Sequence, residues 1–134
     1  MDMERINPAE LGRPSGFSHA VSVTASRMVY LAGQIGTGPD GKVVSGGVVA
    51  QFEQALANLL TALAAAGGQP RHLVSLTIYL TDLKDYQAHG SQIGAVWRRL
   101  AGTEYPAMAG VGVTQLWDPE ALVEIAGIAA VSGS

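Results

Sequence analysis

The carboxylate best placed to do chemistry is Glu124, which stands alone among apolar residues near the end of the chain. The stretch from Glu104 to Ala129 predicts two apolar strands joined by a turn at 117–120, and Glu124 falls on the second strand. A carboxylate held among apolar neighbours can act as a general acid or base. The alternative is that Glu124 is hydrogen-bonded at a subunit interface and only stabilises the assembly.

Histidines are the other side chains that titrate near neutral pH. His19 could donate or shuttle a proton, although a loop-anchoring role is the more common one for a histidine in this setting. His19, His72 and His89 are too far apart in sequence to form the His-x-x-x-His pair of a helical zinc site. The chain has no cysteine, which excludes disulfides and thiolate ligands. The sequence therefore predicts no metal site and no cofactor.

The composition restricts the possible partners. Charged residues make up only 14% of the chain, against about 25% in an average soluble domain, and hydrophobic residues make up 48%. With so few ionic groups to cover the surface, some apolar area is expected to meet another subunit. The net charge of −3 and the scattered basic residues argue against nucleic-acid binding. The adjacent pair Arg98-Arg99 is interpreted as a solvated helix face.

The N-terminal residues are polar and contain no apolar stretch typical of a signal peptide. The longest apolar runs are shorter than the ~20 residues that a membrane-spanning helix needs. We therefore expect a cytoplasmic protein with no membrane partner.

Hydrophobic periodicity predicts two helices. Over residues 48–66 the apolar side chains recur at the spacing of one helical face, and Gly67 follows as a stop. The second helix is predicted to follow Asp82, or Asp85 as an alternative cap, and to end at Gly102.

Alternation of apolar and polar residues predicts the strands. Residues 1–16 contain two prolines and two glycines and are expected to form an irregular lead-in. The strands at 17–25 and 28–34 are separated by a short connection, so they are expected to pair with each other. The other predicted strands are a short one at 42–44, one at 72–81, and a closing hairpin formed by 108–114 and 122–131.

Without the short strand at 42–44, the predicted element order is β-β-α-β-α-β-β, in a single domain spanning residues 1–134. Strands separated by two amphipathic helices predict an α+β fold in which both helices pack on the same face of one sheet.

Several motifs distributed over residues 16–130 occur in the same order in one protein family. They are Gly-Phe-Ser-His-Ala-Val at 16–21, Leu-Ala-Gly-Gln-Ile at 31–35, Gln-Ala-Leu at 54–56, Thr-Ile-Tyr-Leu-Thr-Asp-Leu at 77–83, Tyr-Pro-Ala at 105–107 and Leu-Val-Glu-Ile at 122–125. In this combination the chain resembles the RidA/YjgF family, also named after the endoribonuclease L-PSP. The resemblance implies a mixed sheet similar to that of the small trimeric chorismate mutases. It also implies a homotrimer with three small-molecule clefts between subunits.

The resemblance further implies hydrolysis of reactive imines or enamines to keto acids and ammonia. In that chemistry an arginine holds the substrate carboxylate with two parallel hydrogen bonds, and a glutamate places or activates the attacking water. The family's arginine is replaced here by Met108, and the water-positioning glutamate by Ala126. A cleft tyrosine is replaced by Phe17 and a cleft asparagine by Gly90. Losing the charge-assisted pair weakens carboxylate binding by about 1.5–3 kcal/mol, so imines derived from amino acids should be poor substrates.

The same resemblance suggests roles for the neighbouring positions. The backbone N–H of Gly33 would be offered to the ligand, with Gln34 beside it, because a residue without Cβ allows close approach. Phe17, Tyr86 and Met108 would form apolar walls. The alternative for these three side chains is ordinary packing.

Two functions are consistent with these patterns. In the first, the trimer acts on a reactive imine, enamine or carbonyl compound, using Glu124, His19, water and backbone amides, but is not an efficient 2-imino acid deaminase. In the second, the cleft binds a metabolite or only structures the trimer, without catalysis. The ribonuclease activity that the family's other name implies is disfavoured by the acidic net charge.

Overall fold

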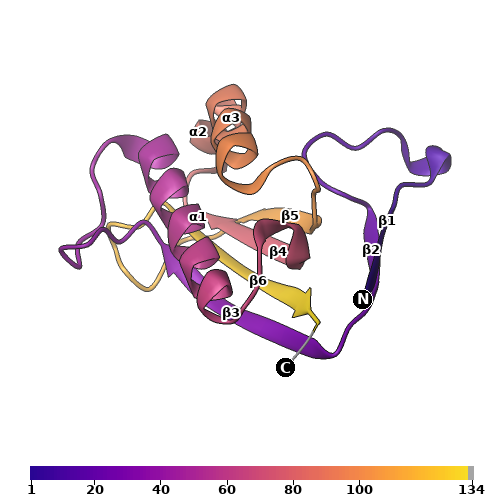
Figure 1. Ribbon diagram of the computed structural model, residues 1–134. Coiled ribbons are helices and arrows are strands. Elements are labelled where there is room, and N and C mark those ends of the chain that lie inside the picture. Colours follow the sequence, from indigo (N-terminus) through magenta and orange to yellow (C-terminus); the bar gives the residue numbers. More distant parts are fainter. Residues whose placement is uncertain (133–134) are drawn as a thin grey trace.

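The centre of the protein is a four-stranded mixed sheet whose helices all lie on one face (Figure 1). The computed structural model describes residues 1–132. The strand order is β3-β6-β4-β5, in which β4 and β5 are parallel and the other pairs are antiparallel. The strands are β3 (Arg27–Ile35), β4 (Leu73–Leu80), β5 (Ala107–Gly112) and β6 (Val123–Val131). The predicted α+β class with a mixed sheet is confirmed.

Helix α1 (Gly47–Ala65) covers β3 and β6, as its leucine spacing predicts. Its inner side chains are almost fully buried and include Phe52, Leu56, Leu59 and Leu63. Gly67 ends the helical segment with a φ of +89°, a conformation in which glycine carries no Cβ penalty. By length and composition alone α1 could cross a membrane, but here its apolar face forms the core against the sheet.

Strand β4 shows how the sheet separates its two faces. Leu76, Ile78 and Leu80 point toward the helices and are buried, whereas Thr77 and Tyr79 lie on the opposite, open face. Because paired residues share a face, this alternation also assigns the side chains of β5 and β6.

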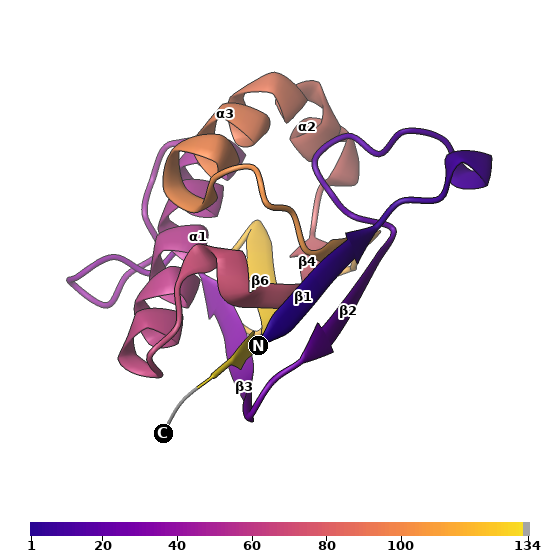
Figure 2. The same ribbon diagram turned by 45° about the vertical axis from the view of Figure 1, so that its right-hand side comes forward.

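The predicted second helix is divided in two at His89, into α2 (Leu83–Ala88) and α3 (Gly90–Ala101). Asp82 caps α2 by accepting a hydrogen bond from the Asp85 backbone N–H at 3.0 Å, so the first of the two predicted caps is correct. At the junction, His89 Nδ1 lies 2.8 Å from the Asp85 carbonyl oxygen. The chain therefore turns between α2 and α3 while both stay on the helical side of the sheet (Figure 2).

The prediction of a closing hairpin is wrong. The strands β5 and β6 do not pair, because β4 lies between them and bonds to both. Their connection instead crosses the end of the sheet and is held by the buried side chain of Gln51 on α1. Its Oε1 accepts from the Leu122 N–H at 2.8 Å, and its Nε2 donates to the Glu120 carbonyl at 3.2 Å. Strands that are adjacent in sequence, such as β5 and β6, often pair directly. Here the apolar strand β4 pairs with both of them and so takes the place between them.

The N-terminal region also differs from the prediction. Residues 1–16 are not wholly irregular, because β1 (Asp2–Ile6) pairs with β2 (Ala20–Thr24) in a separate two-stranded sheet. The strand at 17–25 was predicted to pair with 28–34, yet β2 pairs with β1, and β3 pairs with β6 instead. At 42–44 there is an isolated bridge, Thr37 to Val43, in place of a strand. Two short 3₁₀ turns, Ala9–Leu11 and Pro70–His72, complete the elements.

Ser18 connects the N-terminal region to the edge of the main sheet. Its N–H donates to the Pro106 carbonyl at 2.9 Å, and its hydroxyl donates to the Tyr105 carbonyl at 2.7 Å. The buried Ser18 thereby places the preceding residues, Ser15 and Gly16, beside the start of β5.

Candidate functional site

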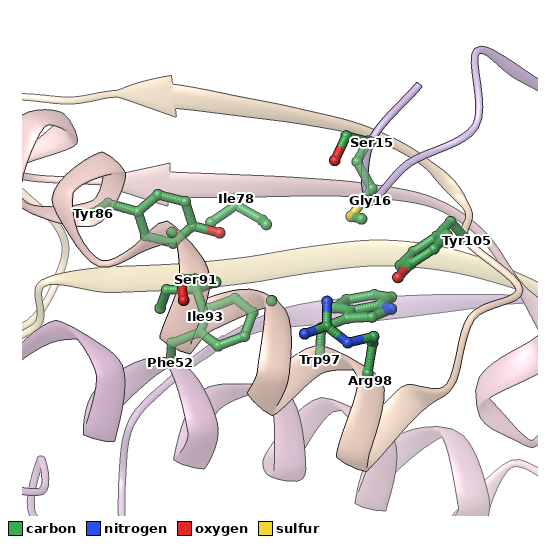
Figure 3. Close-up of a pocket in the computed structure, with 13 residues that line it drawn as sticks. Ser15, Gly16, Phe52, Ile78, Tyr86, Ser91, Ile93, Trp97, Arg98 and Tyr105 are labelled. Atoms are coloured by element: carbon green, nitrogen blue, oxygen red, sulfur yellow. The ribbon is translucent and has the colours of Figure 1, made fainter. Parts of the chain in front are cut away.

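A pocket of about 500 Å³ lies on the helical side of the sheet, between α3 and the β4–β5 edge (Figure 3). Its lining comes from parts of the chain that are distant in sequence: the segment before β2, helices α1, α2 and α3, strand β4, and the residues at the start of β5. The lining residues are Ser15, Gly16, Phe52, Ile78, Tyr86, Gly90, Ser91, Ile93, Gly94, Trp97, Arg98, Tyr105 and Met108.

The floor and walls of the pocket are apolar and aromatic. Met108 shares the helical face with its β4 partner Leu76, so its side chain enters the pocket from the strand side. Trp97 stacks on Tyr105 with ring centroids 6.2 Å apart and 25° between the planes. This surface suits the apolar part of a small molecule.

Tyr86 contributes a phenol that is directed into the pocket from α2 (Figure 3). Its ring also packs edge-on against Phe52, at 6.0 Å between centroids. Burial disfavours the charged phenolate and raises the pKa of Tyr86 to about 12. At neutral pH this hydroxyl is therefore a neutral group that can donate a hydrogen bond to a ligand.

A second group of predicted residues lies on the open face of the sheet. Glu124 pairs with Tyr79 of β4 and with Ile35 of β3, and it is half-buried. Within residues 1–132, its carboxylate has no hydrogen-bond or ion-pair partner. Ala126 lies two residues further along the same face, opposite Thr77. The predicted face for Glu124 and Ala126 is confirmed.

Gly33 lies beneath this carboxylate. A Cβ on Gly33 would overlap Oε2 of Glu124, so the absence of a side chain lets the carboxylate lie across the β3 backbone. The β3–β6 register shifts between Leu31 and Gln34, and this bulge contains Gly33. Gln34 itself pairs with Ile125, which places it on the helical face, away from Glu124.

His19 and Phe17 belong to neither group. Their rings contact each other edge-on, at 5.2 Å between centroids. His19 Nε2 lies 3.2 Å from the Gly12 carbonyl, and the His19 N–H donates to Asn7 Oδ1 at 2.8 Å. In this chain His19 holds the loop between β1 and β2, the anchoring role that was the alternative to proton transfer.

The remaining predicted site residues therefore fall into two groups on opposite faces of the sheet. Tyr86 and Met108 lie in the helical-side pocket, whereas Glu124, Gly33 and Ala126 lie on the open face. Among residues 1–132, no three His, Asp or Glu side chains cluster closely enough to hold a metal ion.

The endoribonuclease L-PSP family matches residues 9–131. The chain belongs to this family, the RidA/YjgF or Rid family. Protein DfrA of Myxococcus xanthus is 41% identical over 101 residues, which cover 75% of this chain and 74% of DfrA. The 2-iminobutanoate/2-iminopropanoate deaminase of Capra hircus is 36% identical over 110 residues, 81% of this chain and 74% of the deaminase.

Solved structures of Rid proteins share the fold. The Rid-family protein YyfB of Yersinia pestis has a TM-score of 0.84 at 36% identity, covering 98% of this chain and 100% of that one. The YjgF protein of E. coli has a TM-score of 0.69 at 29% identity, covering 92% of each chain.

Sequence reasoning missed several residues of this Rid-family pocket. Ser15 and Ser91 carry no pattern of their own, and Tyr105 was noted only as part of the Tyr-Pro-Ala motif; the tertiary contacts bring the three together. Arg98 was assigned with Arg99 to a solvated helix face, yet Arg98 lines the pocket and is the one charged residue among those that do so. Its position one helical turn after Gly94 was the signal that could have distinguished it from Arg99.

Proposed function

We propose that this Rid-family chain forms a homotrimer and hydrolyses a reactive imine, enamine or related carbonyl compound in clefts between its subunits. Each cleft would combine the helical-side pocket of one copy with the open face of the next. The open face offers the apolar surface that association requires, because Met28, Tyr30 and Val111 are exposed on it at 46%, 76% and 37%. Joining two copies would bring together the two groups of residues that a single chain keeps apart.

The observation that carries the choice of substrate is the apolar side chain of Met108 at the point where β5 enters the pocket. The resemblance places the carboxylate-holding arginine of the family at this position. A methionine there cannot bind a carboxylate attached directly to the reacting carbon. The favoured substrate is therefore a compound whose C=N or C=O carbon carries apolar substituents.

In the proposed reaction, Glu124 accepts a proton from water as the water oxygen adds to the imine carbon. Glu124 returns this proton to the imine nitrogen, which gives a neutral carbinolamine. Glu124 then carries the proton of the carbinolamine hydroxyl to the amino group, the C–N bond breaks, ammonia leaves, and a carbonyl compound and the Glu124 carboxylate remain. The half-buried carboxylate of Glu124 lies over Gly33 and has no hydrogen-bond or ion-pair partner among the described residues, which supports this role. The N–H groups of the β3 bulge would orient the ligand.

The relatives support the class of chemistry. The goat protein is a deaminase of 2-iminobutanoate and 2-iminopropanoate, and E. coli TdcF, at 26% identity, has been crystallised with bound serine. Both act on or bind small amino-acid-related molecules, which is the size of ligand that the pocket suits.

A second candidate is a trimer that binds a metabolite without catalysis. This candidate is favoured because Met108 and Ala126 stand where the resemblance places the family's arginine and water-positioning glutamate. Ammonia release separates the two candidates. With a freshly prepared neutral ketimine such as acetophenone imine, release should be faster than in buffer and should be lost in Glu124→Gln. With 2-iminopropanoate, release should scarcely exceed buffer.

Rapid release from 2-iminopropanoate would contradict the substrate assignment. Acceleration of neither imine would favour the binding protein. Light scattering tests the assembly separately: a mass near three times 13.8 kDa is expected, and a monomer would rule out clefts between subunits.

A further inference from the structure

Arg98 is the cation of the pocket, and it enters from α3 and not from β5. It lines the same cavity as Met108 and Trp97, and Figure 3 shows its guanidinium at the end of the pocket where Trp97 and Tyr105 stack. The resemblance places an arginine on β5, but β5 has Met108 at that position. The guanidinium in this pocket comes from α3 instead.

Gly94 allows this orientation of Arg98. The two residues are one helical turn apart, and a Cβ on Gly94 would lie 3.2 Å from Nη1 of Arg98. That spacing is slightly tighter than an ordinary van der Waals contact, so a side chain at position 94 would shift the guanidinium by a few tenths of an ångström. Gly94 itself lines the pocket. The absence of a side chain at Gly94 therefore leaves room for the Arg98 guanidinium at the wall of the pocket.

The charge of Arg98 is not neutralised within the described chain. Over residues 1–132 it has neither an ion pair nor a hydrogen-bond partner, whereas its neighbour Arg99 pairs with Glu53 at 2.8 Å. The pocket lining includes no aspartate or glutamate. An anion entering the pocket would thus find an uncompensated guanidinium and no opposing carboxylate.

The remaining polar groups of the pocket also favour an acceptor-rich ligand. The Tyr86 phenol, which is directed into the pocket, stays protonated at neutral pH and can donate to such a ligand. The hydroxyls of Ser15 and Ser91 line the same pocket and can also donate.

We infer that the pocket binds a carboxylate-bearing ligand through Arg98, with the apolar part of that ligand packed against Met108, Ile78 and Trp97. The anion lies on the α3 side of the cavity, and not at the β5 position where the resemblance places the arginine that holds the carboxylate of a 2-imino acid. This inference deepens the proposed function. The binding of a carboxylate by Arg98 is independent of that function, whereas the class of substrate rests on it. The substrate class becomes an apolar imine or carbonyl compound with a carboxylate separated from the reacting carbon.

Binding of a matched pair of probes tests this assignment. 3-Phenylpropanoate and its amide have the same shape and differ in charge, and calorimetric titration measures their affinities. Wild-type protein should bind the acid more tightly than the amide. Arg98→Gln should weaken the acid by about threefold to fivefold, as expected for an ion pair at an exposed side chain, and leave the amide unchanged.

Arg99→Gln is the matched control, because Arg99 is on the same helix but pairs with Glu53. It should change neither affinity. Arg98→Lys should retain part of the preference for the acid, and added salt should weaken only the acid in wild type. Equal binding of acid and amide by wild type, failure of the acid to bind, or an equal effect of both glutamine variants would overturn the inference.

These outcomes are distinct from failure of the proposed function. The probes contain no imine and release no ammonia, and the pocket lies within one chain, so their binding is measurable in an inactive protein or a monomer. Preferential acid binding without hydrolysis would sustain the role of Arg98 and refute only the catalytic proposal.

Discussion

The carboxylate of Glu124 on β6 lies across the backbone of Gly33 on β3, in the space that a side chain at position 33 would occupy. The two residues belong to neighbouring antiparallel strands, and the bulge in β3 brings them into contact. The position of the candidate base thus depends on a residue type on another strand.

Substituting Gly33 with alanine should therefore act through Glu124. The new Cβ would force the carboxylate to move, and we expect Gly33→Ala to lower the free energy of unfolding by about 1 kcal/mol. In a Glu124→Ala background the same change should cost less, giving a coupling of about 0.5 kcal/mol or more in a double-mutant cycle. Urea denaturation measures both values. Gly110→Ala is the control, since its Cβ would meet only Leu80, at 4.0 Å. Additive effects would show that the contact does not constrain Glu124.

Restoring the two replaced side chains should restore the usual chemistry. Met108→Arg combined with Ala126→Glu should raise ammonia release from 2-iminopropanoate by about tenfold or more, because a charge-assisted pair returns to the cleft. Each single substitution should give less than the pair, since the arginine binds the carboxylate and the glutamate places water. An unchanged rate in a folded double variant would mean that the cleft differs from its relatives at further positions.

The Gln51 side chain should be a main support of the chain reversal before β6. Gln51→Leu leaves the Leu122 N–H and the Glu120 carbonyl without their partner, and the free energy of unfolding should fall by about 2 kcal/mol or more. Gln54→Leu, on the next turn, breaks only a side-chain bond to Asn58 and should have a smaller effect. Denaturant unfolding compares the two, and equal losses would contradict the special role of Gln51.

Tyr86 should make stability fall at alkaline pH. Its pKa is about 12 in the folded protein, because burial disfavours the phenolate, and about 10 in the unfolded chain. The folded state therefore holds a proton that the unfolded state releases, and the free energy of unfolding decreases as the pH rises through this window. The full stabilisation is present below about pH 10, and we expect a loss of about 2 kcal/mol by about pH 12.

Tyr86→Phe should remove this part of the pH dependence while changing stability little at neutral pH. The matched control is Tyr105→Phe, which removes another phenol from the lining of the same pocket. Urea titrations at several pH values distinguish the two. If both variants follow the same alkaline decline as wild type, the buried phenol is not its source.

Local structure, and the face of the sheet or helix on which each residue lies, follow directly from the sequence. The leucine spacing of α1, the alternation of β4 and the placement of Glu124 and Ala126 on one face follow from periods of 3.6 and 2 residues. These features are set by neighbours close in the chain, and the structure agrees with them. The replacement of the family's arginine by Met108 and of its glutamate by Ala126 was also apparent from the sequence, because it concerns residue type alone.

Strand pairing and the contacts between distant side chains do not follow from the sequence in this way. The insertion of β4 between β5 and β6 and the pairing of β1 with β2 depend on contacts between distant segments, which local periodicity does not encode. The same holds for Arg98, whose place in the pocket results from the packing of α3 over β5 and from the space above Gly94. Successive residues of an α-helix point in directions about 100° apart. Arg98 therefore lines the pocket, whereas the adjacent Arg99 forms an ion pair with Glu53.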